Sequence, residues 1–161
     1  MLCIWLETAR KVRAMNKQDK IDGLYMRMAQ TWSENSYCER RKVGALLVKN
    51  QMIISDGYNG TPSKVESCYE RGECYRIKNN IESGTKYETC RSIHAEQNAI
   101  IQAGQDRCQG ATMYIWGHNF ICILCKRFIV QSGITNVVLR KDENSPILHV
   151  TVEDLRRELE A

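Results

Sequence analysis

Helix-like and strand-like patterns alternate along residues 94–139, HAEQNAIIQAGQDRCQGATMYIWGHNFICILCKRFIVQSGITNVVL. The expected order is a helix over 95–103, a strand over 113–116, a helix over 122–131 and a strand over 137–139. Gly104 and Gly133 follow the two helical segments, and glycine is common just past the end of a helix. This alternation predicts helices packed on a central sheet.

The same kind of pattern continues on both sides of this stretch. Apolar residues at helical spacing predict a first helix that ends near Ser33, and its buried face would consist of Ile21, Leu24, Tyr25, Met28 and Trp32. Two short β-rich runs, 43–48 and 52–55, predict a hairpin. Thr151 and Asp154 form a capping-box pattern that opens a last helix over 152–160. The order α-β-β-α-β-α-β-α predicts a three-layer α/β/α domain, with helices on both faces of a mixed sheet.

Length and composition exclude several classes of protein. The chain has 161 residues, of which 43% are apolar and 26% charged, so we expect one globular domain. Its apolar runs are far shorter than the ~18 residues of a membrane span, so no membrane association is expected. The net charge of +4 is mild and no five like charges occur in a row, so we expect no polymeric nucleic acid as a partner.

The chain divides into an N-terminal extension, residues 1–16, and a single domain, residues 17–161. In the extension, basic residues follow a short apolar stretch, which is the reverse of a secretory signal, so we expect a cytoplasmic protein. Residues 63–90 have few apolar side chains and contain three cysteines. We interpret them as an insertion in the domain that needs its own means of staying ordered.

The chemistry is concentrated in His94-Ala95-Glu96 and in Cys122-Ile123-Leu124-Cys125, each at a predicted helix start. In a reducing cytosol, cysteines indicate a metal site or catalysis before disulfides. One imidazole and two thiolates suit tetrahedral zinc with a fourth position for water, which is typical of catalytic zinc sites. Glu96 is near enough to move protons as a general acid–base. A closed structural zinc site, or buried side chains without a metal, are the alternatives.

Three segments together resemble a known family. His94-Ala95-Glu96-Gln97-Asn98-Ala99-Ile100, with the later cysteine pair, resembles the zinc-dependent cytidine and deoxycytidylate deaminases, and most of all the deoxycytidylate (dCMP) deaminase branch. Arg40-Arg41-Lys42-Val43-Gly44-Ala45 and Gly57-Tyr58-Asn59-Gly60-Thr61-Pro62 are similar to the same branch. The resemblance covers about residues 20–140. It implies a cytidine-deaminase-like fold and zinc held by His94, Cys122 and Cys125.

The implied activity is hydrolytic deamination of a free pyrimidine nucleotide, dCMP, to dUMP and ammonia, with Glu96 as the catalytic proton carrier. By resemblance, Asn59 would bond the sugar or base, and the Ala95 N–H would meet the pyrimidine carbonyl oxygen. A turn asparagine is the simpler interpretation of Asn59. Two alternative functions stay open: deamination of another small amino-base, such as cytidine or a guanine-type ring, and a non-catalytic zinc-stabilised interaction or nucleic-acid uptake protein.

Other residues carry weaker expectations. Arg40 and Arg41, with Lys42 beside them, are candidates for the 5′-phosphate, because a guanidinium pairs bidentately with phosphate oxygens; a solvated basic face is the alternative. His118 is expected to be a solvated loop histidine, although it could contact substrate.

Members of the resembled branch suggest two further features. Some hold such an insertion with a second, structural zinc, which here would use Cys68, Cys74 and Cys90, with no fourth ligand evident. Free buried thiols, or a disulfide, are the alternatives. The family also suggests a homo-oligomer. The family's proline before the first cysteine of the pair is Ile121 here, which we expect to alter the rim of the pocket.

Overall fold

The computed structural model describes residues 16–161. The extension predicted for residues 1–16 therefore lies outside the described residues, except for Asn16, which caps the first helix through its side chain. The helices are α2 (Lys17–Ser33), α3 (Cys68–Arg71), α4 (Tyr75–Lys78), the short 3-10 helix η1 (Tyr87–Thr89), α5 (Ala95–Ala103), α6 (Gln105–Cys108), α7 (Ile123–Ser132) and α8 (Val152–Glu160). The strands are β1 (Gly44–Lys49), β2 (Met52–Tyr58), β3 (Thr112–Trp116), β4 (Asn136–Arg140) and β5 (Leu148–Thr151).

The strands form one mixed sheet with the order β2-β1-β3-β4-β5. β1 is antiparallel to both β2 and β3, β3 and β4 are parallel, and β5 is antiparallel to β4. The predicted hairpin is confirmed, because Lys49 pairs with Met52 across a two-residue turn. Its residues, Asn50 and Gln51, both have positive φ angles, of 52° and 61°.

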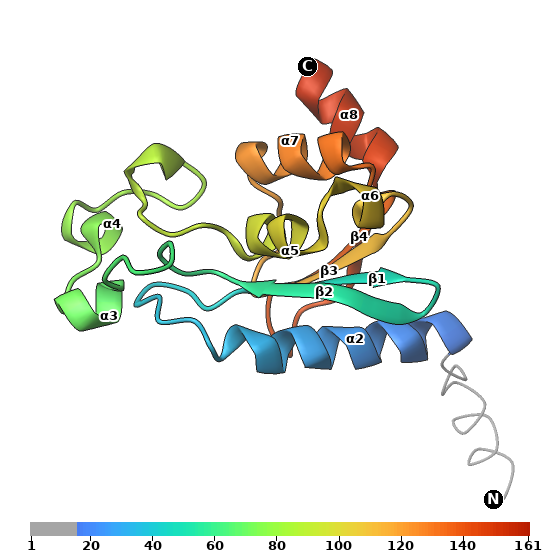
Figure 1. Ribbon diagram of the computed structural model, residues 1–161, viewed down its shortest axis with the longest axis horizontal. Coiled ribbons are helices and arrows are strands. Elements are labelled where there is room, and N and C mark those ends of the chain that lie inside the picture. The colour runs from blue at the N-terminus through green and yellow to red at the C-terminus, as the bar shows by residue number, and fades with distance from the viewer. Residues whose placement is uncertain (1–15) are drawn as a thin grey trace, which may run out of the picture.

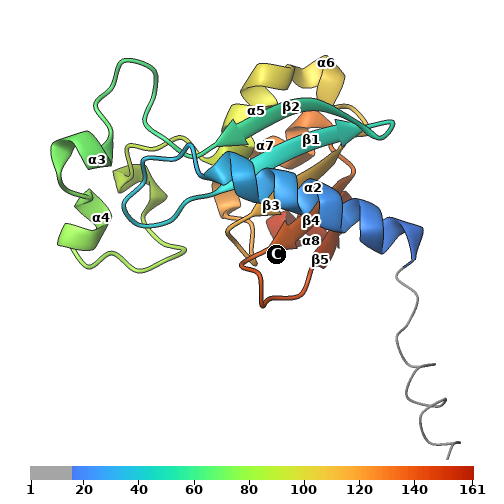
Figure 2. The same ribbon diagram turned by 90° about the horizontal axis from the view of Figure 1, so that it is seen from below.

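Helices cover both faces of the sheet, so the three-layer α/β/α prediction is confirmed. α2 runs along one face, while α5 and α7 lie on the other, with α6 and α8 beside them (Figures 1 and 2). Alternate side chains of each central strand enter the two interfaces, as a pleated strand requires. In β1, Ala45 and Leu47 pack with α5 and α7, whereas Leu46 and Val48 pack against α2. None of the helices in residues 16–161 is long and apolar enough to cross a membrane.

The predicted ends of the helices in the second half of the chain are confirmed. α5 ends before Gly104, α7 ends before Gly133, and α8 begins at the capping box of Thr151 and Asp154. The second strand is longer than predicted and continues to Tyr58. α6 and the edge strand β5 were not predicted, because α6 is a single short turn and β5 has no alternating burial.

The predicted buried face of the first helix is wrong in part. Leu24, Met28 and Trp32 are exposed, while the face against the sheet carries the buried side chains of Asp22, Tyr25, Met26, Ala29 and Ser33. The buried carboxylate of Asp22 accepts hydrogen bonds from the Tyr114 hydroxyl and the Gln18 amide, both at 2.7 Å. A polar residue can thus occupy this interface because its partner comes from β3.

Helix α2 approaches β1 so closely that the strand needs a glycine. A Cβ atom on Gly44 would lie 2.0 Å from the carbonyl oxygen of Ala29 and 2.9 Å from the backbone nitrogen of Ser33. Both atoms are backbone, so no side chain can move to make room. The glycine therefore sets the distance between these two layers.

We expect Gly44→Ala to destabilise the fold by about 1–3 kcal/mol, because the added methyl group overpacks this contact. At about 2–4 °C per kcal/mol, the melting temperature should fall by several degrees. Gly23→Ala is the matched control, because a Cβ there meets nothing closer than 3.8 Å and alanine favours a helix over glycine. Thermal unfolding followed by circular dichroism checks both, and equal melting temperatures for the two variants would contradict the prediction.

The insertion lies to one side of the sheet, beyond the strand ends, and carries α3, α4 and η1 (Figures 1 and 2). A single bridge between Gly60 and Ile93 closes its base. Within residues 63–90 only Cys74 and Arg76 are buried. The insertion therefore has no apolar core of its own.

Candidate active site

Two helix starts bring together the predicted metal ligands. His94 is the N-cap residue of α5, Cys122 is the N-cap residue of α7, and Cys125 lies in the first turn of α7. The Nδ1 atom of His94 is 3.3 Å from the Sγ atom of each cysteine. Among residues 16–161, these three are the group whose ligand atoms all lie within 4.8 Å of one another.

Helix α5 is held against β2 by a contact between backbones. A Cβ atom on Gly57 would lie 2.3 Å from the carbonyl oxygen of Ala95 and 2.6 Å from the backbone nitrogen of Ala99. The first turn of α5, which carries His94 and Glu96, therefore rests directly on the strand.

The two thiols of the site differ in acidity. Hydrogen bonds from Cys125 and His94 stabilise the Cys122 thiolate and lower the pKa of Cys122. The pKa of Cys125 is raised by its hydrogen bond to Cys122 and by burial. One nitrogen and two sulfurs that converge at a partly enclosed position form a donor set that zinc accepts.

Glu96 is 3% exposed and adjoins the three ligands. Burial raises the pKa of its carboxyl group, and the positive charge of His94 partly offsets this effect. A buried carboxyl group beside a metal site and facing a cavity is placed to accept and return protons.

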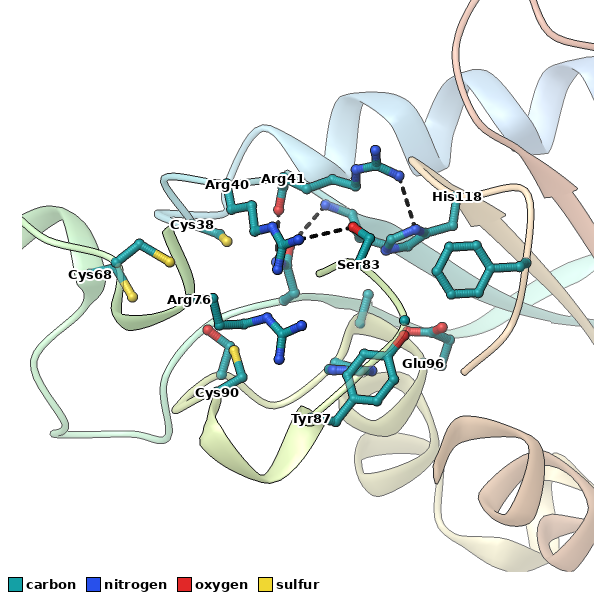
Figure 3. Close-up of a pocket in the computed structure, with 18 residues that line it drawn as sticks. Cys38, Arg40, Arg41, Cys68, Arg76, Ser83, Tyr87, Cys90, Glu96 and His118 are labelled. Carbon is teal, nitrogen blue, oxygen red and sulfur yellow. Dashed lines mark hydrogen bonds between the residues drawn. The ribbon is translucent and has the colours of Figure 1, made fainter. Parts of the chain in front are cut away.

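A single cavity extends from this site towards the insertion (Figure 3). His94, Ala95 and Glu96 line one part of it, as do Asn59, Arg40 and Arg41. The structure thus brings the predicted substrate-binding residues to the predicted metal site. Lys42 is not among the lining residues, and its ammonium group donates to the carbonyl oxygen of Glu34 at 3.3 Å.

Asn59 has a structural task at this cavity. Its side-chain oxygen accepts from the Val43 N–H at 2.8 Å, and its amide nitrogen donates to the Arg41 carbonyl oxygen at 2.9 Å. It thereby holds the segment that leads into β1. One amide hydrogen is left over for another acceptor.

His118 is half-buried and lines the cavity, where it could contact a ligand. The guanidinium of Arg41 lies 3.1 Å from its Nδ1 atom, and because Arg41 can only donate, Nδ1 is the acceptor. Burial and the charge of Arg41 lower the pKa of His118 to about 4, so the ring is neutral near pH 7. The expectation of a solvated loop histidine is therefore wrong.

Sequence reasoning also missed two residues of the insertion at this cavity. Tyr87 packs edge-on to the ring of His94, with ring centroids 5.2 Å apart. The Arg76 guanidinium lies 5.5 Å from the centre of the Tyr87 ring (Figure 3). Neither residue belongs to a motif, and only the fold of the insertion brings them here.

Ile121 does not lie at the rim of the pocket, where it was expected. Its side chain is 5% exposed and belongs to the apolar core between the sheet and α5 and α7. It is not among the residues that line the cavity. The chain therefore replaces the family's proline with a core residue.

A fourth cysteine, Cys38, lies near the three cysteines of the insertion, which the sequence did not predict. Cys68, Cys74 and Cys90 line the cavity together with Cys38, which precedes β1 (Figure 3). Burial raises the pKa of Cys68, and the neighbouring thiols of Cys74, Cys38 and Cys90 raise it further. The four sulfurs are less tightly grouped than the ligands of the His94 site.

Comparisons with known proteins agree with this geometry. Residues 19–141 match the family described as the cytidine and deoxycytidylate deaminase zinc-binding region. The deoxycytidylate deaminase of Schizosaccharomyces pombe is 36% identical over 123 residues, which cover 76% of this chain and 38% of the yeast protein. That of Saccharomyces cerevisiae is 36% identical over 145 residues, which cover 87% and 45%. The chain therefore spans less than half the length of these two relatives.

A solved structure supports the same assignment. The dCMP deaminase of cyanophage S-TIM5, in complex with dCMP and dUMP, is 29% identical with a TM-score of 0.57, and the match covers 78% of this chain and 84% of the phage chain. In the chain described here, the three-layer fold together with His94, Cys122 and Cys125 defines a zinc-binding α/β protein. The chain belongs to the cytidine and deoxycytidylate deaminase family.

Proposed function

We propose that this chain catalyses the hydrolytic deamination of dCMP to dUMP and ammonia. The observation that carries the proposal is the buried carboxyl group of Glu96, which adjoins His94, Cys122 and Cys125 at a cavity that also contains Arg40 and Arg41. Supporting it, the two yeast relatives are deoxycytidylate deaminases, and the cyanophage structure holds dCMP and dUMP.

His94, Cys122 and Cys125 would hold the zinc ion, which, when bound, lowers the pKa of water towards ~7 and so makes a nucleophile available. In the overall reaction the oxygen of water bonds to C4 of the pyrimidine, and the bond from C4 to the amine breaks. Glu96 would take a proton from the water, pass it to N3, and then carry a second proton to the departing amine, which leaves as ammonia.

Other residues of the cavity would hold the nucleotide. Ala95 lies at the first position of α5, where backbone N–H groups have no partner within the helix, so its N–H could meet the pyrimidine carbonyl oxygen. The remaining amide hydrogen of Asn59 could bond the sugar or base. The guanidinium groups of Arg40 and Arg41 would face the 5′-phosphate, which a cytidine or guanine-type substrate lacks.

The test is incubation of the zinc-loaded full chain with dCMP, deoxycytidine, cytidine, CMP and guanine, with measurement of ammonia and of the deaminated product of each compound. We expect ammonia and dUMP in equal amounts from dCMP, at the highest kcat/KM of the panel. Preference for an unphosphorylated base would favour the alternative amino-base deaminase. Zinc binding without ammonia from any compound would favour a non-catalytic protein.

We also propose that Cys68, Cys74 and Cys90 hold a second, structural zinc, with Cys38 as the fourth ligand. The support is the shared location of these thiols and the lack of an apolar core in the insertion. Small units without a sufficient core commonly depend on a metal for stability. A bound ion would draw the four sulfurs into a tighter group than they form here.

Metal analysis should then give two zinc ions per chain. Replacement of Cys68, Cys74 and Cys90 by serine together should reduce the count to one. Cys38→Ser alone should weaken the binding of this second zinc ion. Cys108→Ser is the matched control, because Cys108 is buried in α6 and belongs neither to the cavity lining nor to the His94 group. A count of one zinc in the unmodified protein would contradict the prediction.

A further inference from the structure

Arg76 carries a charge that the structure buries without an acidic partner. Its residue is 5% exposed, in α4 of the insertion. The guanidinium donates to three backbone carbonyl groups: those of Lys86 at 2.7 Å, Glu82 at 2.8 Å and Thr85 at 2.7 Å. The ion pairs found in residues 16–161 all involve other side chains. Burial of a charge is costly unless its hydrogen bonds are satisfied, and here three backbone carbonyl groups take the place of an acidic partner.

These bonds hold residues 82–87, which we call the 82–87 loop. Residues 82–86 are exposed, and the backbone has positive φ angles at Gly84 (89°) and Lys86 (45°). A loop of this kind has little packing of its own to fix it. Three carbonyl groups bonded to one planar guanidinium give it a defined shape.

The 82–87 loop forms one wall of the cavity. Ser83 and Gly84 line the cavity. The Ser83 hydroxyl accepts a hydrogen bond from the Arg40 guanidinium at 3.0 Å (Figure 3). At the other end of the loop, Tyr87 packs against the ring of His94. The loop therefore connects the arginine end of the cavity with the metal ligands.

The charges along the cavity favour an anion at its arginine end. Arg40, Arg41 and Arg76 all line the cavity, and Glu96 is the one acidic residue among the lining residues. Arg40 is hydrogen-bonded to the neutral hydroxyl of Ser83, and the ion pairs of residues 16–161 do not include it. Guanidinium and hydroxyl groups side by side are suitable donors for a phosphate group.

We propose that Arg76 is a positioning residue for phosphate recognition. By fixing the 82–87 loop it places Ser83 beside Arg40, and these two groups receive the 5′-phosphate of the nucleotide. The insertion thus makes the protein select a nucleotide over the corresponding nucleoside. The inference rests on the proposed function for the identity of the base, but the selection for phosphate can be measured without turnover.

The experiment compares binding of dUMP and deoxyuridine to the zinc-loaded full chain by calorimetry. The unmodified protein should bind dUMP more tightly, and Arg76→Gln should reduce the ratio of the two affinities about tenfold, as expected for lost hydrogen bonds to a charged group. Ser83→Ala removes one exposed hydroxyl group and should reduce the ratio about two- to tenfold. Arg71→Gln is the matched control in the same insertion and should leave the ratio unchanged.

If Arg76 has a merely structural role, Arg76→Gln should weaken the binding of dUMP and of deoxyuridine by the same factor. That result would overturn the proposal. If Arg76→Gln fails to fold, Ser83→Ala decides, and an unchanged ratio in that variant would equally overturn it. A protein that prefers dUMP through Arg76 and Ser83 but releases no ammonia from dCMP would contradict the proposed function and support the positioning role. An unmodified protein with no preference for dUMP that still releases ammonia from dCMP would contradict the positioning role and leave the proposed deamination standing.

Discussion

Glu96→Gln should lower kcat for dCMP by about 10²–10⁴-fold, the usual contribution of a general acid–base group. Glutamine has nearly the same shape as glutamate but cannot take a proton from water and return it. Glu96 is buried, adjoins the metal ligands and is not one of the three ligands assigned here. Zinc content and melting temperature should therefore stay close to those of the unmodified protein.

Glu88→Gln serves as the matched control, because Glu88 is an exposed carboxylate on η1, only a few residues from the site in sequence. It should retain near-normal turnover. If Glu96→Gln keeps a similar rate, Glu96 is a structural carboxylate and the proposed proton transfer is wrong. Loss of zinc from Glu96→Gln would instead show that the carboxylate contributes to the metal site.

The second large effect concerns the metal. Cys125 is fully buried, with its sulfur 3.3 Å from the Nδ1 atom of His94. In Cys125→Ser a hydroxyl group, which stays protonated near pH 7, replaces a thiol that becomes a thiolate on metal binding. We expect this variant to lose its catalytic zinc and nearly all activity. Chelation should inactivate the unmodified protein, and added zinc should restore it.

Metal analysis and turnover on the same samples check this expectation, with Cys108→Ser as the control. Both substitutions place a hydroxyl group where a buried thiol stood, so a general loss of stability would affect both. Only Cys125→Ser should lose metal from the His94 site. Full activity in a metal-free preparation, or full zinc in an inactive Cys125→Ser variant, would show that the ligand assignment is wrong.

The metal site could be predicted because its signals are local. His94 and Glu96 are two residues apart at a helix start, and Cys122 and Cys125 are one turn apart at another. Spacing and helix ends alone are enough to predict that His94, Cys122 and Cys125 come together, as they do in the structure. The three layers followed in the same way from alternating segments whose ends carry clear signals, such as Gly104 and Gly133.

The face of α2 could not be predicted in this way, because it depends on a partner far away in sequence. Asp22 is buried where the apolar stripe would not place it, since the Tyr114 hydroxyl bonds to it from β3. Leu24 and Met28, which the pattern predicts to be buried, are exposed. Hydrophobic spacing identifies a helix but does not show which polar side chains find partners across an interface.

The contribution of the insertion to the arginine end of the cavity could not be predicted, for a similar reason. Arg76 and Ser83 lie in a segment without helical or strand periodicity, and their roles depend on contacts with Tyr87 and Arg40. Cys38 carries no motif and adjoins the insertion cysteines only after folding. The sequence indicates Arg40 and Arg41 as phosphate candidates, but no local signal predicts the loop that lines the cavity with them.

The contact between Gly57 and α5 has a mechanical consequence for the site. Side-chain interfaces yield to strain by changing rotamers, whereas two backbones in direct contact have no such freedom. The first turn of α5 and the strand beneath it should therefore move as one unit, and His94 and Glu96 should keep their positions relative to the sheet when a ligand enters. Adjustment to the ligand should then fall to the exposed 82–87 loop of the insertion, which also lines the cavity.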